Sequence, residues 1–412
     1  MLKFFVAVGA IFLTFLSAVA DSSIFNMEPI IIKTSVRGHG NVRAILTHER
    51  NFGIDTTAKF YQGYYVRRGQ DIPVAATYNQ GVYKLTFAGK ITGSSGKRQR
   101  HFTVVVNDQF QQIKSFGIPS SALGEQTCAT HEKNHSTHSM TTLDANQDVL
   151  RISISTYADV EWYNKFGTNS NTEILSLINS SEALYYRQLR IRFKVVSQDV
   201  LTTGLNELDP IVLLRQFSKD ERTFTDANVK FLFTGKDLTT STIGIAYVGS
   251  ICYAPEYSYG VVQSYSSLTA NVFAHELGHI LSASHDTSDY GNIMYPSISM
   301  GDPYFTSNSL NQINIMLSAY GQCIERVAPQ PESVPGILSI YRVGSAVAGV
   351  VYTKTYQPVL NQEVALVINN TTKIVKTNKD GKFKQRLTGR RGKSVTVTAT
   401  VGSLRKRIKF KM

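Results

Sequence analysis

Three histidines and one glutamate stand close together in the segment AHELGHILSASHD, residues 274–286. On a helix, His275 and His279 project from the same face, where their imidazole nitrogens can reach one Zn²⁺ at about 2 Å. Glu276 is poorly placed to bind the same ion and well placed to take a proton from a metal-bound water. His285 follows six residues after His279, so the chain must leave the helix and return to give a third ligand. Three neutral nitrogens leave a fourth position open for water, as a catalytic zinc site requires.

A second His-Glu-x-x-His pattern occurs in CATHEKNHSTH, residues 128–138. Its neighbours are polar, so no apolar stripe would dock a helix there, and an isolated helix this short is unstable in water. The next histidine, His138, follows after three residues rather than six. We therefore interpret this segment as part of a polar linker and predict a metal site only at 274–286.

The residues around the histidines predict the elements that must position them. Apolar residues in SLTANVFAHELGHILSA (267–283) surround the histidine face, which predicts a buried helix. Strand-like and helix-like segments alternate through residues 148–327, which predicts an α/β layer architecture. The alternation consists of predicted strands at 149–158, 191–200, 227–235 and 244–251 and predicted helices at 171–189, 209–220 and 311–324.

Segments rich in predicted strands flank this domain. Residues 21–147 hold runs of β-branched and aromatic residues, followed from about residue 119 by a polar stretch that we interpret as a linker. Residues 328–336 form a proline-rich linker, and residues 337–412 hold short strands separated by turn signals, which predicts a small β-sandwich. The fold class is therefore multidomain: a β-rich N-terminal part, an α/β domain and a C-terminal β-sandwich.

The first twenty residues have the pattern of a secretory signal peptide. Lys3 is followed by the apolar run FFVAVGAIFLTFL and by the small residues AVA at 18–20. No later apolar run is long enough to cross a bilayer. We expect a secreted, extracellular protein with no transmembrane segment; the other interpretation is an uncleaved N-terminal anchor.

The net charge of +13 is concentrated at one end of the chain. From residue 330 onward there are sixteen basic and three acidic residues, which leaves 27 of each sign in residues 1–329. One interpretation of residues 337–412 is a solvated surface that keeps the protein soluble. The other is docking to an anionic surface polymer or to lipid headgroups, without sequence-specific recognition of nucleic acid.

Taken together, the motifs resemble those of the metzincin metalloproteases, specifically the reprolysin (adamalysin) group. HELGHILSASHD resembles the family's His-Glu-x-x-His-x-x-Gly-x-x-His-Asp, and the later NIM, with Met294, resembles its Met-turn. The segment 242–266 resembles the one that precedes the zinc helix in these enzymes. The resemblance covers about residues 148–327 and implies a metzincin-like catalytic domain.

The resemblance implies a role for each matched residue. His275, His279 and His285 would bind one catalytic Zn²⁺, with Glu276 as general base. Met294 would be a structural floor, and Asp286, which follows the third histidine, would support local structure. The strand GIAYVG would be the edge to which an extended peptide substrate adds. Calcium binding stays undecided.

Two departures from the family pattern matter. Ser282 stands where the family has a glycine that turns the chain out of the helix, often at φ > 0; serine tolerates this at a cost of about 1–2 kcal/mol. Pro296 stands two residues after Met294, so a tyrosine fifth ligand like that of the astacins is not expected.

Three cysteines leave one without a partner within the chain. Cys252 and Cys323 fall where the family has a disulfide. Cys128 is then the odd thiol, ahead of the catalytic domain. A thiolate is a strong zinc ligand, so Cys128 could block the open zinc position as a cysteine switch in a zymogen. The alternative is a free or intermolecularly paired thiol.

The sequence therefore predicts a secreted zinc endopeptidase that is made with a β-rich prodomain and cleaves a protein or peptide substrate. One alternative is a catalytically inactive, metal-binding adhesion protein; the presence of Glu276 argues against it. Another makes the basic C-terminal domain the main functional unit. That domain is similar to carboxypeptidase-regulatory or Ig-like sandwiches, a similarity that concerns fold and not function.

Overall fold

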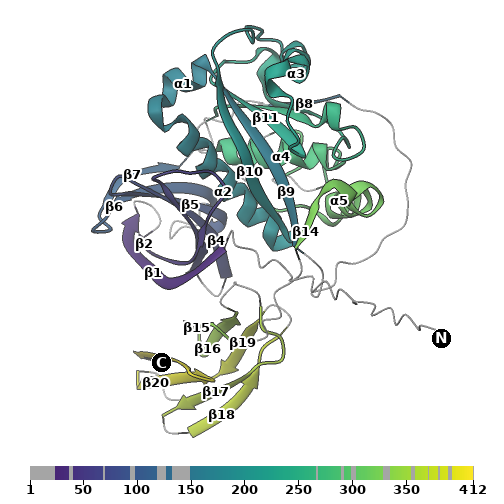
Figure 1. Ribbon diagram of the computed structural model, residues 1–412. Coiled ribbons are helices and arrows are strands. Elements are labelled where there is room, and N and C mark those ends of the chain that lie inside the picture. Colours follow the sequence, from purple (N-terminus) through teal and green to yellow (C-terminus); the bar gives the residue numbers. More distant parts are fainter. Residues whose placement is uncertain are drawn as a thin grey trace, which may run out of the picture.

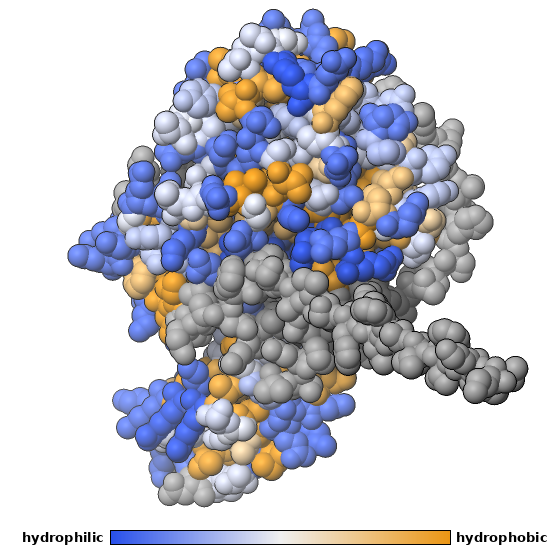
Figure 2. Space-filling model, viewed as in Figure 1, coloured by the Kyte–Doolittle hydropathy of each residue, from blue (hydrophilic) through white to orange (hydrophobic). Residues whose placement is uncertain are grey.

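The structure is a computed structural model, and its described residues fall into three regions (Figure 1). They are 24–36, 40–67, 70–92, 98–117, 127–131, 149–265, 268–288, 292–297, 303–327, 335–353, 358–369, 371–378, 381–387 and 392–411. The predicted signal peptide and most residues of the two predicted linkers lie outside them. Among the described residues, no helix combines the length and the apolar character that crossing a membrane requires. Hydrophilic and hydrophobic residues are interspersed over the face drawn in Figure 2.

The N-terminal region is a seven-stranded antiparallel sheet in which each strand pairs with the next along the chain. Its inward residues, such as Ile32, Leu46 and Val104, form one apolar cluster, as alternation along strands requires. The sheet curls until β1 contacts β7. The strands are β1 (Ile24–Val36), β2 (Gly40–Arg50), β3 (Lys59–Arg67), β4 (Gln70–Asn79), β5 (Val82–Thr92), β6 (Arg98–Asn107) and β7 (Gln112–Gly117).

The middle region has the predicted α/β alternation. Its sheet follows the order β10-β9-β11-β13-β12-β8, and β14 (Glu325–Val327) pairs with β9. The three strands β9 (Val149–Asp159), β10 (Ile191–Leu201) and β11 (Val229–Thr234) run parallel, and β12 (Thr242–Tyr247) is antiparallel to β13 (Tyr259–Gln263). The helices are α1 (Val160–Phe166), α2 (Ser170–Leu189), α3 (Pro210–Lys219), α4 (Thr269–Ile280) and α5 (Ser307–Tyr320).

The strand β8 (Thr127–His131) corrects one sequence-based prediction. These five residues belong to the stretch predicted as a polar linker, yet they pair with β12 as a parallel strand. Polar residues can form such a strand because backbone hydrogen bonds to an existing edge, rather than side-chain burial, supply the pairing.

The C-terminal region has two antiparallel sheets, one in the order β15-β16-β19 and the other β18-β17-β20-β21. Val347 and Val351 of the first sheet and Val364 and Val397 of the second belong to a single buried cluster. The strands are β15 (Ile337–Val343), β16 (Ala346–Tyr352), β17 (Glu363–Ile368), β18 (Thr371–Lys376), β19 (Lys382–Arg386), β20 (Ser394–Val401) and β21 (Leu404–Lys411).

Candidate metal centre

The helix α4 carries the first two histidines through the middle of the α/β region. It packs against β12, β13 and α2, and almost every residue from Thr269 to Ile280 is buried. His275 is 3% exposed and His279 is fully buried. A helix with apolar residues on most of its sides is expected in such a position, so the sequence places two polar imidazoles in the interior.

The three imidazoles converge on one point. The ring centroids of His275 and His279 lie 4.6 Å apart, and the ring of His285 lies 5.3 Å from the first and 4.9 Å from the second. One potential ligand atom from each residue lies within 4.8 Å of the other two. Among the described residues, this is the one cluster of three or more His, Cys, Asp or Glu side chains that could hold a metal ion.

Backbone carbonyls orient the two helical histidines. Nδ1 of His275 lies 2.6 Å from the carbonyl oxygen of Ile293, and Nδ1 of His279 lies 2.7 Å from that of Ala283. A carbonyl only accepts, so each Nδ1 donates its proton and each Nε2 presents a lone pair. The two Nε2 atoms are 2.9 Å apart. Facing lone pairs at this distance repel one another, and a cation between them removes the repulsion, so the donor set fits a metal ion.

Burial keeps these imidazoles neutral. Burial, with a smaller effect of His285, lowers the pKa of His275 to about 3, and burial together with the neighbouring histidines lowers the pKa of His279 well below its usual value. Neutral imidazoles are the form that binds Zn²⁺. The electrostatics and the tautomers therefore favour the same chemistry.

A tight turn brings the chain back from α4 to His285. The N–H of Ala283 donates to the carbonyl of Gly278, and the N–H of Ser282 donates to that of His279, at 2.9 and 2.8 Å. This is the Schellman pattern, which requires a left-handed residue after the helix. Ser282 takes that conformation at φ 79°, at the position where glycine is expected. The same turn presents the Ala283 carbonyl that orients His279.

The loop after His285 packs against α4 and orients one of the histidines. Its Ile293 carbonyl orients His275, and the N–H of Asp286 donates to the carbonyl of Met294 at 2.8 Å. Met294 is fully buried, and its sulfur lies 2.5 Å from the point that a Cβ on Gly278 would occupy. Glycine at 278 therefore allows the loop to lie against the helix.

Asp286 ties this loop together. Its carboxylate accepts hydrogen bonds from the backbone and hydroxyl of Ser288 and from the hydroxyl of Thr306. Burial alone would raise the pKa of Asp286, but these hydrogen bonds outweigh it and hold the pKa below its usual value. A charged carboxylate at this position stabilises the segment that carries the third histidine.

Glu276 is buried between α4 and β12. Gly244 of β12 lies against its carboxylate, since a Cβ at Gly244 would collide with Oε1 of Glu276 and with Val272. On the α2 side, the hydroxyl of Tyr185 donates to the carbonyl of Ala274 at 2.7 Å. Burial, followed by the negative charge of Glu276, raises the pKa of Tyr185 well above its usual value. Sequence reasoning missed the contacts of Tyr185 and Gly244 with α4: Tyr185 belongs to no motif, Gly244 was noted only as part of the substrate edge, and only the fold brings both to α4.

In this structure β8 covers the strand GIAYVG, the edge to which a peptide substrate is expected to add, so the substrate edge stays a prediction. β8 lies along β12 in parallel, with Cys128 opposite Gly244, Ala129 opposite Ile245 and Thr130 opposite Ala246. The register thus pairs Cys128 with Gly244, the β12 residue that lies against Glu276. His131 belongs to the same strand, and the remaining residues of the second motif, from Glu132 to His138, lie outside the described part.

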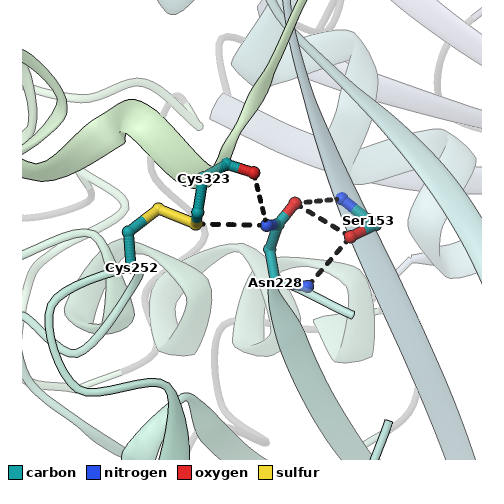
Figure 3. Close-up of a disulfide and its surroundings, with 4 residues drawn as sticks. All are labelled: Ser153, Asn228, Cys252 and Cys323. Carbon is teal, nitrogen blue, oxygen red and sulfur yellow. Dashed lines mark hydrogen bonds between the residues drawn. A yellow bond between two sulfur atoms is a disulfide. The ribbon is translucent and has the colours of Figure 1, made fainter. Parts of the chain in front are cut away.

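The disulfide Cys252–Cys323 is present (Figure 3). It joins the loop after β12 to the end of the α5 region. Asn228 donates through Nδ2 to the carbonyl oxygen and the sulfur of Cys323, while its Oδ1 accepts from the backbone and hydroxyl of Ser153 on β9. The disulfide and Asn228 thus fasten the end of the domain to its central sheet.

Known proteins match the middle region. Residues 150–322 match the family described as metallo-peptidase family M12, the reprolysins. A zinc metalloproteinase named recombinant fibrinogenase II, from Deinagkistrodon acutus, is 39% identical over 137 residues, which are 30% of this chain and 58% of that protein. The snake venom metalloproteinase atroxlysin-1, from Bothrops atrox, is 41% identical over 103 residues, 23% of this chain and 50% of that protein. This chain thus spans about half the length of the curated relatives it matches.

Proposed function

Because residues 150–322 form a reprolysin-like metzincin catalytic domain of metallo-peptidase family M12, we propose that this protein is a zinc-dependent endopeptidase. One observation carries the proposal: His275, His279 and His285 converge with two Nε2 lone pairs facing each other, beside the buried carboxylate of Glu276. This is the donor set and the base that hydrolysis by a zinc-activated water needs.

In the proposed mechanism, His275, His279 and His285 would hold the ion, which would supply Lewis acidity to the scissile carbonyl and to the attacking water. Glu276 accepts the proton of that water and later donates it to the leaving amine. Met294 and Asp286 hold the loop and the turn that fix the ligands. The alternative, an inactive metal-binding adhesion protein, does not need a buried carboxylate next to the metal.

A variant of the base tests this function. Glu276→Gln keeps the shape of the side chain and removes the base, so we expect cleavage of a broad protein substrate to fall by about 10²–10⁴-fold with zinc content unchanged. Glu256→Gln, at an exposed carboxylate after β12, is the matched control. Chelator-insensitive cleavage, or equal activity of the two variants, would exclude the mechanism. Both proteins carry introduced cleavage sites on the two sides of β8 and are cut at these sites before the assay. The cuts prevent β8, which covers the edge of β12, from masking the activity.

We further propose that the protein is secreted as a zymogen in which the signal peptide (1–20) is removed and β1 to β8 belong to the prodomain. The covered edge of β12 supports this, because a peptide substrate that adds to the same edge must displace β8. Cys128 would then reach the open zinc position as a cysteine switch. The domain limits 21–147, 148–327 and 337–412 are part of the same proposal.

A second proposed function concerns the C-terminal region. We propose that this region is an Ig-like or carboxypeptidase-regulatory-like sandwich and that it binds a linear polyanion. Leu404, Ile408 and Phe410 of β21 pack on the core, so the alternate residues point to the other face. These are the exposed Arg405, Arg407, Lys409 and Lys411.

The row of basic side chains on β21 has a row of hydroxyl side chains on the neighbouring strand β20 beside it. The four basic residues pair across the strands with Thr400, Thr398, Thr396 and Ser394 of β20, respectively. Alternate residues on a strand repeat at about 7 Å, which gives a regularly spaced row of positive charges suited to a linear sulfated polysaccharide. None of the described residues in the two rows is aromatic, so the base stacking that single-stranded nucleic acid favours is missing from them.

Salt-dependent retention on heparin tests this surface. Arg407→Ala with Lys409→Ala should elute at lower salt than the wild type, because each lost contact reduces the number of released counterions. Arg215→Ala with Lys219→Ala, on the exposed face of α3, removes the same charges elsewhere and serves as control. Equal shifts for both pairs would indicate net charge alone, and binding to anionic vesicles or duplex DNA but not to heparin would contradict the chosen ligand.

A further inference from the structure

A buried ionic cluster joins the N-terminal sheet to the α/β region. Arg50, at the end of β2, holds Glu182 of α2 through two hydrogen bonds of 2.6 and 2.7 Å, and both side chains are 0% exposed. Arg192 of β10 contacts the same carboxylate at 3.0 Å, and the N–H of Phe193 donates to it at 2.7 Å. Burial would raise the pKa of Glu182, but Arg50 and Arg192 outweigh it and lower that pKa.

The contact runs along one face of α2. Residues 173, 176, 179 and 182 recur at intervals of three, so each is turned by about 60° from the one before, and together they form a stripe that winds along one side of the helix. Lys84 pairs with Glu173 at 2.5 Å, and the hydroxyl of Thr77 donates to Ser176 at 2.8 Å. Asn179 donates to the carbonyls of Tyr61 and Ala76 at 3.1 and 3.2 Å. Such a polar helix face would ordinarily meet water, and here strands β2 to β5 cover it.

Apolar packing adds to these polar contacts. Phe52, Ala58 and Phe60 belong to the same buried cluster as the core of the α/β region rather than to the core of their own sheet. The N–H of Val195 on β10 donates to the carbonyl of Phe52 at 2.8 Å. The N-terminal region therefore completes the hydrophobic core of the catalytic domain.

The opposite side of α2 supports the zinc helix. The hydroxyl of Ser181 donates to the carbonyl of Ala270, and that of Tyr185 donates to the carbonyl of Ala274, both at 2.7 Å. α2 thus lies between the N-terminal sheet and α4. By contrast, among the described strands β8 pairs with β12 alone, along a single edge.

We propose that the sheet β1–β7, although it belongs to the prodomain of the chain as made, stays bound to the catalytic domain without a covalent link when the chain is cut, and that only the β8 segment of the prodomain leaves. The surface that holds it is the polar face of α2 with Arg192 and Phe193, and its partner is the detached fragment of this same chain. Loss of the sheet would uncover Glu182 and Asn179 and part of the apolar core, whereas loss of β8 would free a strand edge. The activating role of β8 release rests on the proposed function; retention of the sheet does not.

The experiment uses the full chain with Glu276→Gln, which prevents self-digestion, and with cleavage sites for a sequence-specific protease introduced within 118–126 and within 132–148. After both cuts, size-exclusion chromatography is expected to show the fragment that carries β1–β7 co-eluting with the fragment that begins before β9, while the short β8 peptide elutes separately. Separate elution of the two large fragments in native buffer would overturn the proposal. Because the readout is co-elution, failure of the proposed peptidase function leaves this result unaffected.

Matched variants test which contacts hold the sheet. In the doubly cut protein, Arg50→Met should weaken the complex by at least tenfold, because Glu182 loses one of its two buried cations. Lys59→Met, at a side chain 55% exposed on β3, should leave it unchanged. Thermal unfolding of the uncut variants checks that each is folded before cutting. A complex that Arg50→Met does not weaken would show that the buried ionic cluster is not what retains the sheet.

Discussion

Met294 lies directly against Gly278: its sulfur stands 2.5 Å from the place of a Cβ on that glycine. Gly278 is on the zinc helix next to His279, and Met294 is in the loop whose Ile293 carbonyl orients His275. The contact therefore sets how closely the loop approaches the helix. A change in that distance is transmitted to the ligand rings.

Gly278→Ala tests this contact. The added methyl group must displace the Met294 sulfur, and overpacking of this kind costs about 1–3 kcal/mol. We expect a lower free energy of unfolding in denaturant and a lower zinc affinity. Gly321→Ala is the control, because its nearest neighbour would be an ordinary contact at 3.7 Å and its φ is −73°. Equal behaviour of the two variants would contradict the role of Met294.

Ser282 holds a left-handed conformation that suits glycine better. At φ 79° a side chain costs about 1–2 kcal/mol, and the greater freedom of glycine in the unfolded chain offsets part of the gain. Ser282→Gly should therefore raise the free energy of unfolding by up to about 1 kcal/mol. Ser218→Gly, inside α3, should lower it by a similar amount. A loss of stability in Ser282→Gly would show that the serine contributes something that the turn geometry does not reveal.

Cys128→Ala tests the proposed switch in the uncut chain. In the proposed switch the thiolate of Cys128 binds the metal, so without it the β8 strand would keep only its backbone pairing. Peptide cleavage by the uncut protein should rise by about tenfold or more, equivalent to a weakening of at least about 1.4 kcal/mol. Thr130→Ala, two positions along the same strand, should stay latent. A Cys128→Ala protein as silent as Thr130→Ala would leave Cys128 as a free or intermolecularly paired thiol.

The disulfide Cys252–Cys323 closes a loop between residues 71 positions apart. In the chain-entropy account, a loop of this length stabilises the fold by about 4 kcal/mol. Replacing both cysteines by serine should lower the free energy of unfolding by up to that amount, and a reducing agent should have the same effect on the wild type. Cys128→Ser serves as control in the same denaturant series. A loss of stability seen only in the reduced wild type, and not in the double serine variant, would show that loop closure is not the cause and that the free thiols destabilise the protein.

The sequence predicted well where a pattern is local. Four-residue spacing on an apolar helix predicted that His275 and His279 share a face. Ser282, which stands where the family has a glycine, marked the turn after the helix, and its φ is indeed positive. It predicted poorly where pairing is remote. The β8 strand was predicted as linker because its residues are polar, and its stability comes from the backbone edge of β12, far along the chain.

By itself, the sequence determined the metal-binding chemistry, because residue type and helical spacing fix which nitrogens can meet one ion. Only the tertiary structure decided what surrounds that chemistry. Gly244 and Tyr185 reach α4, and Arg50 reaches Glu182, through contacts between residues far apart in the chain. Local periodicity carries no signal for such contacts, since they depend on how sheets and helices pack.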